Sequence, residues 1–201
     1  MKIDKLWNGL KRIANGDYVL EGDLTSEETI EIDLDDRFVV KGKIRAKKSI
    51  VVRCGIKAGD GINAGRSIEA GCGIEAGDGI EAGDGIKTGW SIEAGDGIKA
   101  GDGIEAGWSI EAGRSIEAGD GIEAGWSIEA GCGIKAGNGI EAGWSIKAKK
   151  FIDVKKRIFA GISVYRTSRD CDKTIRCAEL RNGEICYGDL TLTKEDKPDE
   201  G

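Results

Sequence analysis

The sequence contains no histidine, one proline and one methionine among its 201 residues. The absence of histidine removes the side chain best suited to proton transfer at neutral pH and a frequent zinc ligand. With a single proline, the 33 glycines cannot belong to a collagen-like or a proline-rich disordered chain. Frequent, evenly spread glycine is typical instead of a repeat with a tight turn in every unit.

Long apolar segments are also missing. No segment approaches the roughly 18 apolar residues of a membrane-spanning helix, and the charged segment 1–18 does not resemble a secretory signal. We therefore expect a cytoplasmic protein without membrane association, whose six cysteines are free thiols. The net charge of −6 disfavours direct binding to nucleic acids, because they require a positive surface.

Isoleucine recurs at every sixth position from Ile56 to Ile146, and the same phase extends with other residues over 32–164. The unit reads Ile-(Glu/Lys)-Ala-Gly-x-(Gly/Ser). In a strand, Ile and Ala point to one side and the charged residue between them to the other, which predicts an apolar interior. We expect the glycine after Ala to supply the unusual backbone angles of a corner. A period of six indicates a β-helix.

The variable residue x shows how many hexads form one coil. The tryptophans of the repeat are Trp90, Trp108, Trp126 and Trp144, each 18 residues from the next. A coil of three hexads stacks them along one edge of a triangular prism, with coils about 4.8 Å apart. We therefore predict an all-β, three-sided β-helix (β-solenoid) with 18 residues per coil, and about seven coils over 32–164.

The two ends depart from the repeat. In segment 1–20, apolar residues at helical spacing predict an amphipathic helix that caps the first coil. The β-helix is expected over 21–164, with regular hexads at 50–150. In 165–193, the Asn182–Gly183 dipeptide predicts a β-hairpin that caps the other end, and 194–201 is expected to be a disordered acidic tail. The residues of the predicted helix face are Ile3, Leu6, Trp7, Leu10, Ile13 and Ala14.

In periodicity, residues 32–164 resemble the left-handed hexapeptide β-helix of acyltransferases and γ-class carbonic anhydrases. That family has a small residue two positions before each aliphatic one, where this chain has Asp, Trp, Arg or Cys. The segments GKIRAKKSIVV (42–52) and SIKAKKFIDV (145–154) look more like the bactofilin-like, polymer-forming β-helices, and this resemblance implies a right-handed coil. The enzymes of the first family use histidine as a base or zinc ligand. We therefore expect no enzyme activity, no cofactor and no metal.

Cys54 and Cys72 precede the tryptophans in the same series and are one coil apart. That spacing is short enough for a disulfide or a soft metal ion. Two thiolates without further ligands make a weak zinc site, so the simpler interpretation is that cysteine is a tolerated small residue at a corner.

Charge is banded along the chain. Residues 41–53 hold six basic and no acidic side chains, 54–146 hold sixteen acidic and six basic, and 147–157 hold six basic and one acidic. The acids are stacked on neighbouring coils, where like charges repel, and the tryptophans form an apolar strip of the kind found at contact sites. The candidate partner-binding residues are Trp90, Trp108, Trp126, Trp144, Glu75, Glu93, Glu111, Glu129, Glu105, Glu123, Glu141, Asp84, Asp102 and Asp120.

Three functions fit this surface. The first is a non-enzymatic interaction protein whose acidic, Trp-striped face binds a positively charged, nucleic-acid-binding protein, as a DNA-mimicking inhibitor of the type carried by phages or mobile elements. The second is a self-assembling, bactofilin-like scaffold in which the tryptophans form a homodimer seam. The third is a glycan-binding β-helix. A fourth interpretation gives the surface no binding function. In that case glutamate was simply copied when the repeat was duplicated, and the tryptophans stack only on each other.

Overall fold

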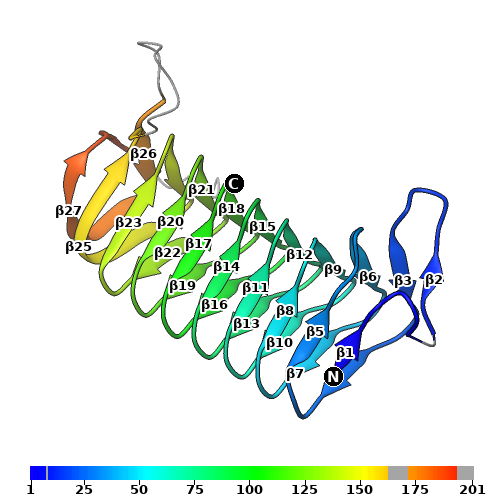
Figure 1. The fold of residues 1–201 in the computed structure, drawn as a ribbon. Coiled ribbons are helices and arrows are strands. Elements are labelled where there is room, and N and C mark those ends of the chain that lie inside the picture. Colours follow the sequence, from blue (N-terminus) through cyan, green and yellow to red (C-terminus); the bar gives the residue numbers. More distant parts are fainter. Residues whose placement is uncertain (8, 163–171, 194–201) are drawn as a thin grey trace, which may run out of the picture.

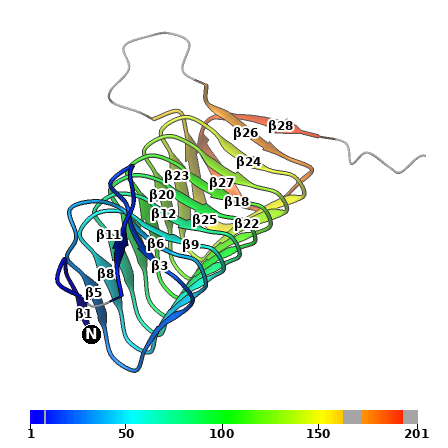
Figure 2. The ribbon, with the colours of Figure 1, turned by 90° about the vertical axis from the view of Figure 1, so that its right-hand side faces the viewer.

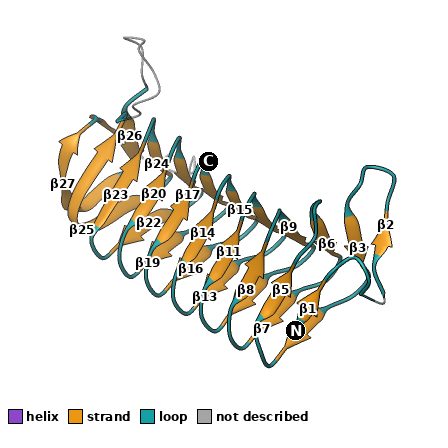
Figure 3. Cartoon of the chain, viewed as in Figure 1, coloured by secondary structure: helices purple, strands orange, loops and turns teal. Residues whose placement is uncertain are grey.

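In the computed structural model, the chain is a long, three-sided coil of short strands (Figures 1 and 2). The structure describes residues 1–7, 9–162 and 172–193. About nine coils stack in parallel, which confirms the β-helix predicted from the sequence. No helix occurs in these described ranges (Figure 3), and hence none that could cross a membrane.

Each side of the coil is a ladder of parallel strands paired in register. Face 1 contains β4 (Leu24–Ser26), β7 (Ile44–Ala46), β10 (Ile62–Ala64), β13 (Ile80–Ala82), β16 (Ile98–Ala100), β19 (Ile116–Ala118) and β22 (Gly133–Ala136). Face 2 contains β1 (Lys2–Ile3), β5 (Ile30–Ile32), β8 (Ile50–Val52), β11 (Ile68–Ala70), β14 (Ile86–Thr88), β17 (Ile104–Ala106), β20 (Ile122–Ala124) and β23 (Gly139–Ala142).

Face 3 closes the triangle. It contains β2 (Lys11–Arg12), β3 (Tyr18–Leu20), β6 (Phe38–Val40), β9 (Ile56–Ala58), β12 (Ile74–Ala76), β15 (Ile92–Ala94), β18 (Ile110–Ala112), β21 (Ile128–Ala130), β24 (Ile146–Ala148), β26 (Thr174–Cys177) and β28 (Asp189–Leu192). Two longer strands, β25 (Phe151–Ala160) and β27 (Glu179–Tyr187), continue from face 1 onto face 2.

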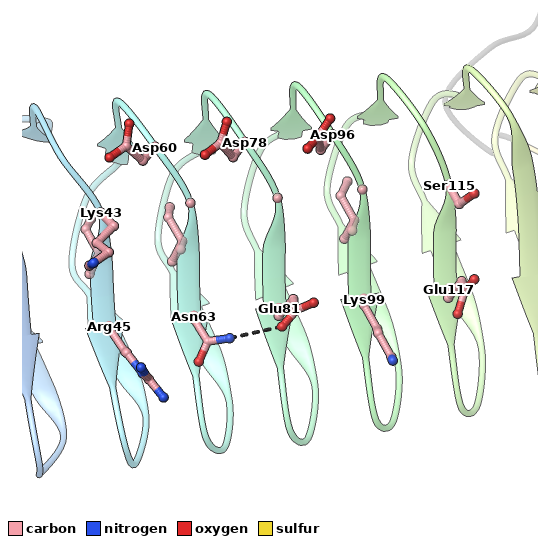
Figure 4. Close-up of a pocket in the computed structure, with 16 residues that line it drawn as sticks. Lys43, Arg45, Asp60, Asn63, Asp78, Glu81, Asp96, Lys99, Ser115 and Glu117 are labelled. Carbon is pink, nitrogen blue, oxygen red and sulfur yellow. Dashed lines mark hydrogen bonds between the residues drawn. The ribbon is translucent and has the colours of Figure 1, made fainter.

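The coil is right-handed, as the sequence resemblance implied. Figure 4 looks onto face 1 from outside, with the chain advancing from left to right. On this near side the strands run downward, from Lys43 just before β7 to Arg45 within it. A chain that descends on the near side while it advances to the right turns in the right-handed sense.

Isoleucine and alanine fill the interior, as the hexad pattern predicted. Every isoleucine of the regular hexads, from Ile56 to Ile146, is at most 1% exposed. Paired residues in these coils are 18 positions apart, as with Ile62 and Ile80, so isoleucine stacks on isoleucine along each face. The coil length of 18 residues is therefore confirmed.

The glycine after each alanine serves a different purpose from the one predicted. Glycines with positive φ lie near the chain ends, at Gly9, Gly16, Gly22, Gly161, Gly183 and Gly188, and not at the regular corners. A Cβ on Gly101 would instead lie 1.8 Å from the carbonyl oxygen of Gly83 in the preceding coil. Glycine is needed there because the backbones of successive coils approach closely. The second glycine of the hexad is less crowded, and serine replaces it in several hexads.

The coil from Tyr18 to Arg37 contains two residues more than the regular coils. Ile30, and not the predicted Ile32, pairs with Ile50, and Tyr18 pairs with Phe38, both 20 positions apart. The extra residues lie in the connection from face 2 to face 3, where Leu34 is buried. The hexad phase therefore holds from Phe38 onward and is displaced before it.

The predicted amino-terminal helix is wrong. Residues 2–3 and 11–12 form strands β1 and β2, and Leu6 of the predicted apolar face is 93% exposed. The backbone edge of the first coil explains this difference. Its unpaired N–H and C=O groups can pair with an extended segment, but not with a helix, whose backbone groups bond to one another. The Glu31 amide donates to the Met1 carbonyl oxygen at 2.8 Å, and β2 pairs antiparallel with β3.

The predicted carboxy-terminal hairpin is also wrong. Strand β27 runs straight through Asn182 and Gly183 and pairs in parallel with β25. Gly183 has a φ of 115° and lies at an irregularity of this ladder, not at a hairpin turn. The β-helix thus continues through β26, β27 and β28 to residue 192. Val164 and the predicted tail at 194–201 lie outside the described residues.

Candidate protein-binding surface

The four tryptophans form a continuous stack along the corner between face 2 and face 3, here called the Trp corner. Successive indole rings have centroids 5.5–5.6 Å apart and planes within 9° of parallel. Each sits between the end of a face 2 strand and the start of a face 3 strand, so the 18-residue period places them in one column. Trp90, Trp108 and Trp126 remain 45–53% exposed.

The stack exposes ring edges more than ring faces. Because neighbouring planes are almost parallel at 5.5 Å, each inner indole covers a face of the next one. This arrangement explains how a column of large apolar residues is tolerated in water. It also leaves an apolar ridge of exposed ring edges, which runs along the coil axis and can contact a partner.

Two rows of glutamates flank the Trp corner, one on each face, as the sequence predicted. On face 3, Glu75, Glu93, Glu111 and Glu129 occupy successive strands at paired positions. On face 2, Glu105, Glu123 and Glu141 do the same. All point outward between buried isoleucine and alanine, and all but the half-buried Glu75 are exposed.

Lysines occupy the positions next to the ends of the glutamate rows. The sequence analysis did not assign them a role, although they lie in the same columns. Lys57 forms an ion pair with Glu75 at the start of the face 3 row, and Lys147 follows Glu129 at its end. On face 2, Lys87 lies 2.5 Å from Glu105. Within the described part of the chain, no cation approaches the remaining carboxylates of the two rows to within 4.0 Å. Those carboxylates are Glu93, Glu111, Glu129, Glu123 and Glu141.

Face 1 gives the comparison that makes these rows significant. Its outward positions read Arg45, Asn63, Glu81, Lys99, Glu117, Lys135 and Asp153, so opposite charges alternate from Glu81 onward (Figure 4). The Asn63 amide donates to the Glu81 carboxylate at 3.1 Å. Alternating charges are what cross-strand stability favours. The same hexad thus carries balanced charge on face 1 and unbalanced charge on both sides of the Trp corner.

The pKa of Glu141 shows an effect of these neighbouring like charges. Partial burial raises the pKa of its carboxyl group, and the neighbouring charge of Glu123 raises that pKa further. Both effects disfavour the ionised carboxylate. A neutralising cation from a bound partner would relieve them.

The predicted aspartates lie apart from the tryptophans. Asp84, Asp102 and Asp120 stack on successive coils at the corner between face 1 and face 2. They are exposed, and the Asn138 amide donates to the Asp120 carboxylate at 3.2 Å. These aspartates therefore border the far edge of face 2 and do not line the Trp corner.

The comparisons and the side-chain geometry point to no established chemistry. Known protein families, curated proteins and solved structures show no match to this chain. Across the residues that the structure describes, no group of three or more His, Cys, Asp or Glu side chains could hold a metal ion. The site has to be interpreted from its own geometry.

Proposed function

We propose that this protein is a non-enzymatic interaction protein that binds a positively charged protein through the Trp corner and its two glutamate rows. The observation that carries the proposal is the contrast between faces. If glutamate had merely been copied with the repeat, face 1 would show the same runs of like charge. Among the outward strand positions, runs of glutamate on successive coils occur only on the two faces that meet at the apolar ridge, which is typical of a surface whose complement is supplied by a partner.

The charge density suits a partner that otherwise binds nucleic acid. Two carboxylates per coil at a spacing of about 4.8 Å give one negative charge per roughly 2.4 Å of axis, compared with about 1.7 Å for duplex DNA. A groove lined with lysine and arginine would accept such a rod in place of a duplex. We therefore propose a DNA-mimicking inhibitor of a nucleic-acid-binding protein.

Competition with DNA tests this proposal. A panel of purified basic DNA-binding proteins is loaded with labelled duplex DNA, and displacement by this protein is followed at increasing salt. We expect displacement from at least one member, weakening as salt rises because the contacts are ionic. The double variant Trp108→Ala, Glu111→Lys should no longer displace the labelled DNA.

Glu117→Lys is the matched control for the charge change. Glu117 lies on face 1, six residues from Glu111 and likewise exposed, between Lys99 and Lys135. This variant should displace DNA as well as the unmodified chain. Equal losses in the two variants would assign the effect to net charge and not to the Trp corner, and no displacement from any member would refute the inhibitor.

The Trp corner is poorly suited to self-association. With the four tryptophans of two copies aligned in parallel, Glu105 of one copy meets Glu111 of the other, and Glu123 meets Glu129. An antiparallel arrangement sets Glu105 against Glu123 and Glu111 against Glu129. In both arrangements, glutamates face glutamates at the coils of Trp108 and Trp126, and their repulsion disfavours the dimer. The stacked indole faces also argue against sugar binding, because a sugar ring needs a free aromatic face.

A bactofilin-like scaffold is the second candidate, and one observation favours it. The last strands, β27 and β28, are largely exposed, with Leu190 and Leu192 at 40% and 59%. Exposed final strands can pair with another copy end to end. Sedimentation at low and high salt distinguishes the candidates. A monomer at both salt concentrations would exclude the scaffold, and concentration-dependent polymers would support it.

A further inference from the structure

Cys54 and Cys72 lie directly below the tryptophans in the same corner column, and their side chains meet. The two Sγ atoms are 3.4 Å apart on adjacent coils. The Cys72 amide donates to the Cys54 carbonyl oxygen at 3.0 Å, which fixes the register of the pair. Both thiols are partly buried. Burial, followed by the contact with Cys54, raises the pKa of the Cys72 thiol.

The surroundings of the pair form a shallow hollow at the end of the Trp corner. Arg37, Glu75 and Trp90 line it together with both cysteines. The side chain of Arg37 passes close to Gly55, and its guanidinium lies 3.7 Å from the Glu75 carboxylate. A cation and an aromatic ring therefore border two neighbouring sulfur atoms.

The geometry of adjacent coils disfavours a disulfide here. Side chains at equivalent positions of stacked coils project in parallel, so their Cβ atoms are separated by about the 4.8 Å between coils, whereas the Cβ atoms of a disulfide are about 3.5–4.5 Å apart. Two metal–thiolate bonds of about 2.3 Å, arranged in line, hold two sulfur atoms roughly 4.6 Å apart. The two side chains reach this separation by rotating from their 3.4 Å contact toward the spacing of the coils. A bridging ion thus fits the pair with less distortion than a sulfur–sulfur bond.

We propose that Cys54 and Cys72 form a two-coordinate site for a soft monovalent cation, with Cu(I) as the ion that thiolates favour. Among the described residues, no third His, Cys, Asp or Glu side chain forms a metal-binding group with the pair, which disfavours zinc because zinc takes four ligands. Binding replaces both thiol protons, so Cu⁺ and two thiols give a bis-thiolate complex of charge −1 and two released protons. No oxidation is involved. Arg37, which lines the hollow and also pairs with Asp17 and Glu75, contributes positive charge beside this anionic complex.

Cys132 provides a matched control. It is partly buried at a different corner, where its neighbours on adjacent coils are Arg114 and Lys150 instead of a second thiol. The full-length, reduced protein is titrated with Cu(I) under anaerobic conditions against a chromogenic Cu(I) chelator. We expect one tightly held ion per chain, accompanied by proton release and by partial quenching of the tryptophan fluorescence, because Trp90 lines the same hollow.

The variants decide the outcome. Cys54→Ser and Cys72→Ser should each weaken binding by more than the roughly 10–100-fold that loss of a supporting group costs. Cys132→Ser should bind as the unmodified chain does, and circular dichroism should show the same strand content in all variants. Unchanged affinity in either Cys54→Ser or Cys72→Ser would overturn the proposal, as would equal loss in Cys132→Ser. Because this readout involves no protein partner, its failure would leave the DNA-competition test unaffected.

Discussion

At the scale of single residues, the fold depends on close approach as much as on burial. The glycine after each alanine lies against the backbone of the preceding coil, whereas the glycine two residues later has room for a side chain. Sequence periodicity showed both positions but assigned the first to corner angles. The distinction between them is steric, and it leads to a direct test.

Gly101→Ala should destabilise the protein strongly and Gly103→Ala hardly at all. A Cβ would lie 1.8 Å from a carbonyl oxygen at the first position and 3.4 Å from one at the second. Since the backbone oxygen cannot move without disturbing its coil, we expect a cost of about 3 kcal/mol or more for Gly101→Ala. Urea unfolding measures both variants. Similar unfolding midpoints would contradict the close-approach explanation.

Glu141→Gln should raise stability at neutral pH. The pKa of Glu141 in the folded protein is raised, so its ionised form is disfavoured there, and this cost appears as the pH rises through the folded pKa. As the pH falls through the same value, Glu141 becomes protonated and the advantage of glutamine should disappear. Unfolding midpoints of both proteins at pH 7 and at about pH 4 provide the check. A difference that does not change with pH would refute it.

At the scale of elements, the stacked column of tryptophans is a unit that no single coil contains. Each coil contributes one indole, and the stack exists only because successive coils are in register. The terminal strands show the same dependence on neighbours. Segment 2–12 has helical spacing of apolar residues, yet it follows the edge of the first coil. Lys5–Asp35 and Arg12–Asp36 ion pairs, both at 2.7 Å, hold it to the extra residues of that coil.

Trp108→Ala should cost about twice as much stability as Trp90→Ala. Trp108 stacks on two indoles, whereas Trp90 stacks on Trp108 alone within the tryptophan column. At about 0.5–1.5 kcal/mol for each aromatic pair, the difference between the variants is on the order of 1 kcal/mol. Near-ultraviolet circular dichroism should lose more signal in Trp108→Ala, because the remaining stack is divided. Identical spectra and midpoints would argue that the indoles do not interact.

At the scale of the whole molecule, the hexads are interchangeable in the core but not on the surface. Every regular hexad supplies the same buried isoleucine, so the interior does not distinguish one face from another. The outer residues do, because each column carries its own side chains. The number of coils and the alignment of outer side chains into columns are therefore independent properties of the β-helix.

Two deletions separate these properties. Removing residues 110–127, one full coil, should leave a shorter β-helix with its three remaining tryptophans in one column. Removing 110–115, a single hexad, should also leave a folded β-helix, but should turn the carboxy-terminal part by a third of a coil and divide the stack into two pairs. Far- and near-ultraviolet circular dichroism report the two features. Unfolding of the six-residue deletion alone would show that the faces are not equivalent.

The sequence alone determined the regular part of this protein. Strict recurrence of isoleucine gave the strand positions and the buried side. Segregation of tryptophan into one of three series gave the 18-residue coil, the Trp corner and the glutamate rows beside it. These features are predictable because each coil repeats the environment of the last, so a local pattern has the same meaning everywhere along the repeat.

Only the tertiary structure decided the ends, the first coil and the contacts between columns. A helix was predicted for 1–20 and a hairpin for 165–193 because local spacing and turn residues favour them. Unpaired backbone groups at each end of the coil override those preferences by pairing with further strands. The role of glycine and the meeting of Cys54 with Cys72 likewise depend on distances between coils, which the sequence does not contain.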